Sequence, residues 1–129
     1  MPIAIFGWGT ACSDIDPDPF FAIGEAAQRP CARKHTHEDV VEIHVTLDRG
    51  RRVDIRDDRF EATSPQMTAA GPEDNPFGVP AGTTAHRVAD AYVAAIRSLT
   101  PGRHIIVSDL VTTFFSATST PIIDVVPRP

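Results

Sequence analysis

The sequence predicts an α+β fold in a single domain over 1–129, with a mainly antiparallel sheet packed by one principal helix at about 85–99. Three observations support this prediction. The chain has 129 residues, the length of one ordinary domain. The segment 40–47 alternates apolar and polar residues, as a half-buried strand does. Strand-like segments precede and follow one helix-like segment, which is the order found in α+β proteins rather than in alternating βαβ proteins.

Short strands and loops are predicted for the N-terminal part of the chain. Ile3 to Phe6 is an apolar strand candidate. The segment 7–19 contains two glycines and two prolines, which oppose a helix, so we expect a loop there. Phe20 to Ile23 is a brief apolar run that suits a second strand.

The clearest strand signal lies at Val40 to Leu47, where every second residue is apolar. Asp48 to Arg51 then has the composition of a hairpin turn. The alternation continues from Arg52 to Arg56. We therefore expect these two segments to pair as antiparallel strands.

A long irregular loop is predicted from Glu61 to Thr84, because the segment has four prolines, three glycines and no periodicity. It contains Met67, Phe77 and Val79, apolar side chains that a free loop would leave in water. We therefore expect these three residues to form an interface with a neighbouring subunit or an adjoining protein, with Phe77 as the main anchor.

The principal helix is predicted from about Ala85 to Leu99. Val88, Tyr92 and Ile96 recur at helical spacing, and Thr84 suits the N-cap.

The C-terminal segment that follows is rich in β-branched and aromatic residues. His104 to Phe115 reads as a long strand, 116–121 as a turn, and Ile122 to Val126 as a last strand.

Composition excludes some classes of function. A formal net charge of −5 argues against binding to duplex DNA through its phosphates. No apolar run approaches the roughly 20 residues of a membrane-spanning helix, and no signal peptide is evident, so we expect a protein that stays inside the cell and contacts no membrane. Cys12 and Cys31 are then expected to be free thiols.

Several patterns resemble chemical sites but lack a required part. The segment 7–12 follows a strand as a dinucleotide-binding loop does, but a cysteine stands where the third glycine should be. His37 and Glu38 begin a zinc-protease-like pattern whose second histidine is missing. His35, His37 and His44 lie in or near a predicted strand, where alternation brings at most two of them to one face. We expect them to be surface residues.

Four carboxylates have the spacing of a calcium loop: Asp14, Asp16, Asp18 and Glu25. Such a loop needs a glycine at its sixth position for a sharp turn, and Pro19 stands there. An acidic turn is the simpler interpretation, and we expect neither a metal nor a cofactor.

One enzymatic alternative stays open. Removal of Met1 would make Pro2 the N-terminal residue, and an N-terminal proline followed by a strand resembles the general base of the tautomerase superfamily. In those enzymes a helix follows the first strand, whereas a proline-rich segment follows here.

Two segments resemble phage tail terminator (tail completion) proteins. In the first, an apolar run ending in Gly24 and Glu25 leads to the alternating strand 38–47. In the second, the helix-like segment 86–96 is followed by strand-like segments from Gly102 onward.

The resemblance implies a non-enzymatic virion protein. Such proteins form a ring, typically of six subunits, that docks on the tail tube protein, stops tube polymerisation and joins the tail to the head connector protein. DNA would pass through the lumen without specific binding. The protein would assemble in the host cytoplasm and end in the virion tail. Another structural protein of the phage neck or tail is an alternative of the same kind.

Overall fold

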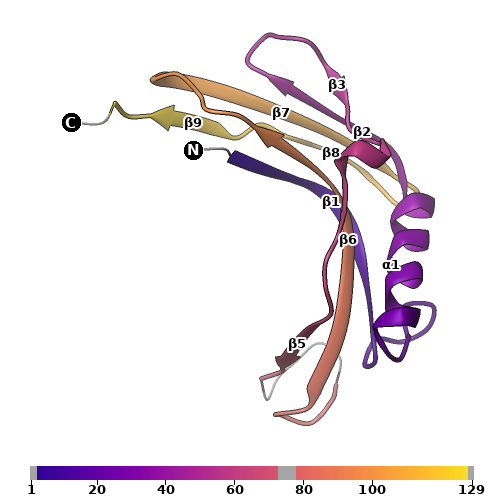
Figure 1. The fold of residues 1–129 in the computed structure, drawn as a ribbon. Helices are drawn as coiled ribbons and strands as arrows, with labels where there is room; N and C mark the ends of the chain where they lie inside the picture. The colour runs from indigo at the N-terminus through magenta and orange to yellow at the C-terminus, as the bar shows by residue number, and fades with distance from the viewer. Residues whose placement is uncertain (1–2, 73–77, 128–129) are drawn as a thin grey trace. The chain divides into compact units, whose positions relative to one another are not determined.

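The computed structural model describes residues 3–72 and 78–127, with side chains from residue 7 onward. It shows an α+β protein with one principal helix and two antiparallel sheets, which confirms the predicted fold class (Figure 1). The elements follow in the order β1 (Ile3–Ser13), α1 (Glu25–Asp39), β2 (Val40–Leu47), β3 (Val53–Asp54), η1 (Asp58–Phe60), β4 (Glu61–Thr63), β5 (Met67–Ala70), β6 (Thr84–Ile96), β7 (Gly102–Thr112), β8 (Ser116–Ser119) and β9 (Ile122–Val125).

The helix predicted over 85–99 is wrong, because this segment forms strand β6. Val88, Asp90, Tyr92 and Ala94 are all buried, and their period of two is that of a strand. The same segment also places apolar residues three or four positions apart, so its alanine-rich sequence satisfied both patterns.

The principal helix is α1, in a segment where no helix was predicted. Its buried residues are Gln28, Ala32 and Thr36, one per turn, and two of the three are polar. Hydrogen bonds to backbone groups satisfy these two buried polar side chains. The Gln28 side-chain amide donates to the carbonyl oxygens of Ala22 and His86, each at 2.9 Å, and the Thr36 hydroxyl donates to the carbonyl oxygen of Asp90 at 3.0 Å. An apolar periodicity could therefore not reveal this helix.

Other boundaries also differ from the prediction. Strand β1 continues to Ser13 through part of the predicted loop 7–19. The segment 20–23 is not a regular strand, although Phe21 forms one isolated bridge with Ser13. Strands β4 and β5 interrupt the predicted loop 61–84, and β8 replaces the predicted turn at 116–121.

The strand prediction at 40–47 and the hairpin after it are confirmed. Strand β2 has the predicted bounds and pairs antiparallel with β3, with Val45 opposite Val53. Strands β7 and β9 lie within a few residues of their predicted positions.

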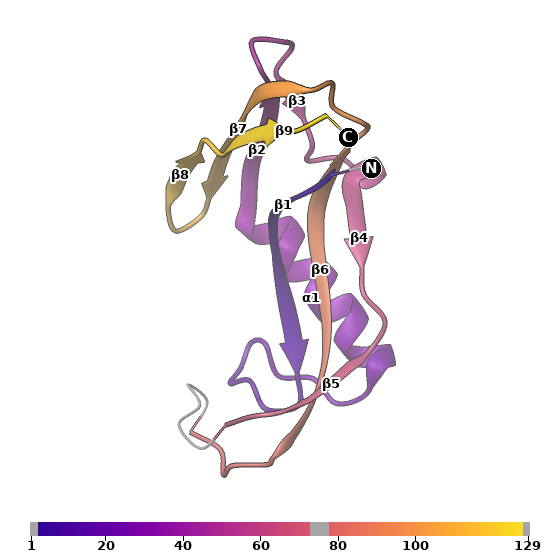
Figure 2. The same cartoon turned by 90° about the vertical axis from the view of Figure 1, so that its left-hand side faces the viewer.

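The strands form two sheets (Figure 2). The first has the order β1-β6-β4, and β5 also pairs with β6. The second has the order β3-β2-β7-β8, and β9 also pairs with β7.

The chain divides into two compact units. The first unit comprises 1–8, 38–61 and 92–129, and the second comprises 9–37 and 62–91. The core of the first unit contains the buried residues Val40, Ile43, Val45, Ile55, Tyr92, Ala94 and Ile106. One folding domain over 1–129 stays a prediction. The described residues include no helix long and apolar enough to cross a membrane.

Candidate protein-binding groove

Strand β5 lies in the second unit, and all four of its residues are exposed. It pairs antiparallel with β6, so that Met67 is opposite Arg87 and Ala69 is opposite Ala85. Among the described residues, β6 is the only strand with which β5 pairs. The other edge of β5 therefore presents backbone groups that no described strand uses.

The alternation of the ladder shows which backbone groups face outward. The N–H of Gly71, just after β5, donates to the carbonyl oxygen of Thr83 at 3.4 Å. Hydrogen-bonded pairs recur at every second residue of an antiparallel ladder, so Ala69 and Met67 also direct their backbone groups toward β6. Thr68 and Ala70 therefore direct their N–H and C=O groups away from β6.

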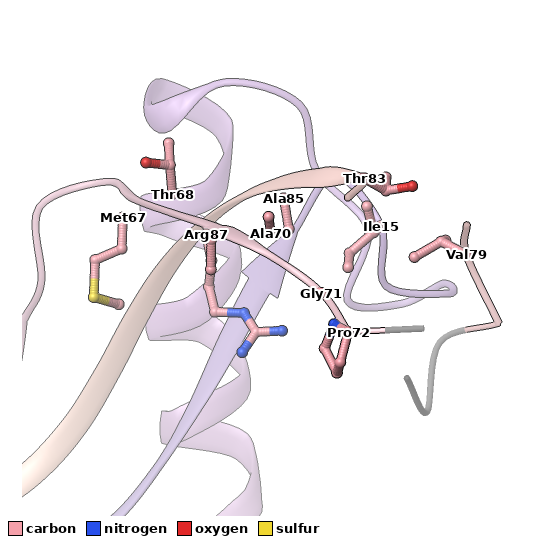
Figure 3. Close-up of a pocket in the computed structure, with 11 residues that line it drawn as sticks. Ile15, Met67, Thr68, Ala70, Gly71, Pro72, Val79, Thr83, Ala85 and Arg87 are labelled. Carbon is pink, nitrogen blue, oxygen red and sulfur yellow. The ribbon is translucent and has the colours of Figure 1, made fainter. Parts of the chain in front are cut away.

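An apolar groove of about 450 Å³ lies along β5, on the face of the β5–β6 ladder that carries Met67 and Arg87 (Figure 3). Its apolar lining comes mainly from Ile15, Met67, Pro72, Val79 and Ala85. Met67 and Arg87 project to the same side of the β5–β6 ladder. The groove thus combines an apolar surface with the Arg87 guanidinium, which lies 4.0 Å from the Asp16 carboxylate. Its volume lies within the range of ordinary ligand pockets.

The loop after β1 is fixed to β6 by Asp14, and this contact positions Ile15 at the groove. The Asp14 carboxylate accepts the backbone N–H of His86 at 2.9 Å and lies 2.7 Å from His86 Nδ1. The backbone hydrogen bond from His86 is the main reason why the pKa of Asp14 lies below its ordinary value.

Two of the three predicted interface residues line this groove. Met67 is 44% exposed on β5, and Val79 lies on the loop before β6. Phe77 lies outside the described residues, so its predicted role as an anchor has no structural counterpart here. That these residues contact another protein stays a prediction.

Three of the four carboxylates with calcium-loop spacing have separate partners. Asp14 binds His86, Asp16 accepts a hydrogen bond from the Ser13 hydroxyl at 2.5 Å, and Glu25 forms an ion pair with Arg29 at 2.9 Å. Within the described part of the chain they form no cluster that could hold a metal ion. These contacts explain the acidic residues as parts of a turn and a helix start.

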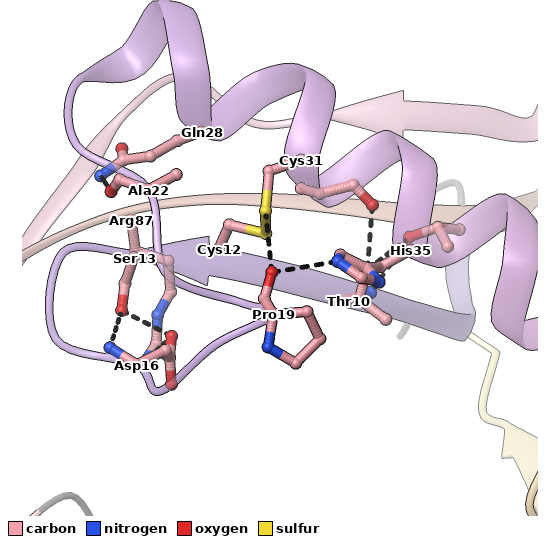
Figure 4. The surroundings of a disulfide bond; sticks show 12 residues. Thr10, Cys12, Ser13, Asp16, Pro19, Ala22, Gln28, Cys31, His35 and Arg87 are labelled. Atoms are coloured by element: carbon pink, nitrogen blue, oxygen red, sulfur yellow. Dashed lines mark hydrogen bonds and ion pairs between the residues drawn. A yellow bond between two sulfur atoms is a disulfide. The ribbon is translucent and has the colours of Figure 1, made fainter.

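The prediction that Cys12 and Cys31 are free thiols is wrong, because they form a disulfide (Figure 4). The bond joins β1 to α1. The prediction was wrong because it rested on the expectation of a protein that stays inside the cell, where thiols remain reduced.

The structure also changes the interpretation of the three histidines. His35 and His37 lie on α1 rather than in a strand, and His35 is next to the disulfide. His44 lies on β2, as predicted, with Asp54 and Asp109 opposite it on the two neighbouring strands. Pro2, the candidate base of the enzymatic alternative, lies outside the described residues.

Comparisons of the chain with protein-family models, with curated proteins and with solved structures gave no match.

Proposed function

We propose that this chain is a non-catalytic module that binds an extended segment of another polypeptide along the outer edge of β5. The observation that carries the proposal is the edge itself. Four consecutive residues, Met67 to Ala70, are exposed in a strand, beside an apolar groove. An exposed strand edge is a template for pairing with another chain.

Recognition would use the backbone and the groove together. The outward N–H and C=O groups of Thr68 and Ala70 would pair with the backbone of the bound segment, which gives affinity without sequence preference. Apolar side chains of the segment would occupy the groove beside Met67 and Val79. Burial of one such side chain contributes about 1.5 to 3 kcal/mol.

A ring at the end of a phage tail is the more specific form of this proposal. In that form the bound segment belongs to the next copy of the chain, typically in a ring of six, and the ring contacts the tail tube and head connector proteins around the DNA. A ring needs two different complementary patches on each subunit. The β5 edge is one candidate, and the exposed strand β8 is another.

Two observations weigh against that specific form. The helix over 86–96, which supported the resemblance to tail terminators, is a strand. The Cys12–Cys31 disulfide is typical of proteins that fold in oxidising compartments, whereas tail assembly in a host cytoplasm would expose it to reductants. The broader proposal depends on neither observation.

Selection of peptides from a random display library against the purified chain tests the broader proposal. We expect selected peptides to lose at least tenfold in affinity for Ala70→Pro, because proline removes an outward N–H but no β5–β6 hydrogen bond. Ser116→Pro is the matched control, because it removes an outward N–H from the exposed edge of β8. In NMR spectra, the changes in backbone amide chemical shift on peptide addition should be largest at Thr68 and Ala70.

Sedimentation of the chain over a range of concentrations tests the ring. A ring predicts a species of several subunit masses that Ala70→Pro converts to monomer. If the chain is monomeric at every concentration, the ring form of the proposal is refuted. Selected peptides that bind Ala70→Pro as tightly as the unchanged chain would refute the β5 proposal itself.

A further inference from the structure

Three metal-ligating side chains converge at the disulfide, in the second unit and apart from the β5 groove. Cys12 comes from β1, whereas Cys31 and His35 lie one turn apart on α1. One ligand atom from each residue lies within 4.8 Å of the ligand atoms of the other two. Two thiolates and one imidazole form a ligand set typical of zinc.

We propose that reduction of the Cys12–Cys31 disulfide creates a binding site for one thiophilic divalent cation, Zn²⁺, with the sulfur atoms of both cysteines and the imidazole of His35 as ligands.

The distances suit a tetrahedral ion with modest movement of the side chains. Zn–S and Zn–N bonds of about 2.3 and 2.0 Å place the two sulfur atoms about 3.8 Å apart and each sulfur about 3.5 Å from the nitrogen. The Cα atoms of Cys12 and Cys31 are 6.1 Å apart, which leaves room for both sulfur atoms to reach one ion. Side-chain rotation therefore suffices, without movement of β1 relative to α1.

The ring of His35 is held in place before any ion binds (Figure 4). Its Nε2 lies 3.1 Å from the carbonyl oxygen of Pro19, and the Phe20 ring packs against it at 4.6 Å between centroids. The same carbonyl oxygen lies 3.8 Å from the Cys31 sulfur. A carbonyl oxygen only accepts, so Nε2 carries the proton in this contact and can bind an ion only after the proton has moved to Nδ1. The carbonyl oxygen released by that change, or a water molecule, can then occupy the fourth coordination position.

Burial differs between the two sulfur ligands. Cys12 is fully buried, whereas Cys31 and His35 are partly exposed. An ion can therefore enter from the side of Cys31 and His35. In the reduced protein it would also compensate the charge of the buried Cys12 thiolate, which would otherwise lack a counter-charge.

Oxidation and metal binding exclude each other at this site. A dithiol reductant transfers two electrons to the disulfide, which yields two protein thiols and the oxidised cyclic form of the reductant. Zn²⁺ then displaces one proton from each thiol, and both protons pass to solvent. In the disulfide neither sulfur is a thiolate, so the oxidised protein cannot bind the ion through sulfur.

Titration with Co²⁺, a spectroscopic substitute for Zn²⁺, tests the proposal. The chain is reduced with a phosphine under anaerobic conditions. We expect one Co²⁺ per chain, a sulfur-to-cobalt charge-transfer band and tetrahedral d–d bands, all lost on addition of Zn²⁺. The oxidised chain and Cys31→Ser should lack the charge-transfer band. His35→Ala should weaken binding at least tenfold, whereas His37→Ala, on the same helix, should leave it unchanged.

A stability measurement keeps the test decisive if reduction loosens the fold. Zn²⁺ should raise the melting temperature of the reduced chain and slow its reoxidation by diamide, and it should do neither for reduced Cys31→Ser. A reduced chain with two titratable thiols, no charge-transfer band and no response to Zn²⁺ would overturn the proposal. Equal Co²⁺ affinity of His35→Ala and the unchanged chain would overturn the role of His35.

Discussion

Replacement of Gly9 by alanine tests the close contact between β1 and β6. A Cβ atom at Gly9 would lie 1.9 Å from the carbonyl oxygen of Asp90 and 2.5 Å from the Cβ of Ala91, whereas real Cβ atoms keep at least 3.0 Å. The backbones of the two strands would have to separate locally by about 1 Å. Overpacking typically costs 1 to 3 kcal/mol, and an immobile backbone obstacle places this case near the upper value, about 3 kcal/mol.

Urea unfolding followed by circular dichroism measures this loss for Gly9→Ala. A loss of about 3 kcal/mol in the free energy of unfolding should lower the melting temperature of a chain of this length by roughly 10 °C. Gly50→Ala is the matched control, because its Cβ would meet only the Leu47 carbonyl oxygen, at 3.0 Å, in an exposed turn. We expect Gly50→Ala to change the free energy of unfolding by less than about 0.5 kcal/mol. Equal stability of the two variants would refute the close approach of β1 to β6.

Three further predictions concern stability. Replacement of Cys12 and Cys31 together by alanine should lower the free energy of unfolding of the oxidised protein by about 3 kcal/mol, the chain-entropy value for a sequence separation of 19, as measured in urea. Ile106→Ala should lower it by about 2 to 5 kcal/mol in the same assay, because Ile106 is 1% exposed in the core of the first unit. The hydrogen bond that His104 Nδ1 donates to the Asp48 carboxylate raises the pKa of His104 above its ordinary 6.5. The stability from this pair is therefore complete below pH 6.5 and is lost as pH rises through the raised pKa. Melting temperatures between pH 5 and 9 should show this decline for the unchanged chain and not for His104→Gln.

Local sequence patterns determined the elements whose burial is also local. Strand β2 alternates apolar and polar residues because one face of its sheet packs on the core, and this alternation was legible in the sequence. The turn after it, at 48–51, was identified by its composition. The α+β class was predicted correctly because it needs only the presence of both kinds of segment.

Elements that are buried by contacts with segments distant in sequence could not be predicted from local patterns. Strand β6 pairs with β1, β4 and β5, and these neighbours decide that its alanine-rich sequence is a strand rather than a helix. Helix α1 buries Gln28 and Thr36 through hydrogen bonds to backbone groups that are distant in sequence, such as those of His86 and Asp90. No hydrophobic period marks such a helix.

The sequence by itself determined the fold class and the strand 40–47 with its hairpin, and it singled out Met67 and Val79, which both line the groove. Only the tertiary structure decided where the principal helix lies, that Cys12 and Cys31 are joined, and that His35 lies beside them. The physical reason is the sequence separation over which each kind of interaction acts. Alternation and turn chemistry act over a few residues, whereas a disulfide, a strand pairing or a ligand cluster depends on which distant segments the whole fold brings together.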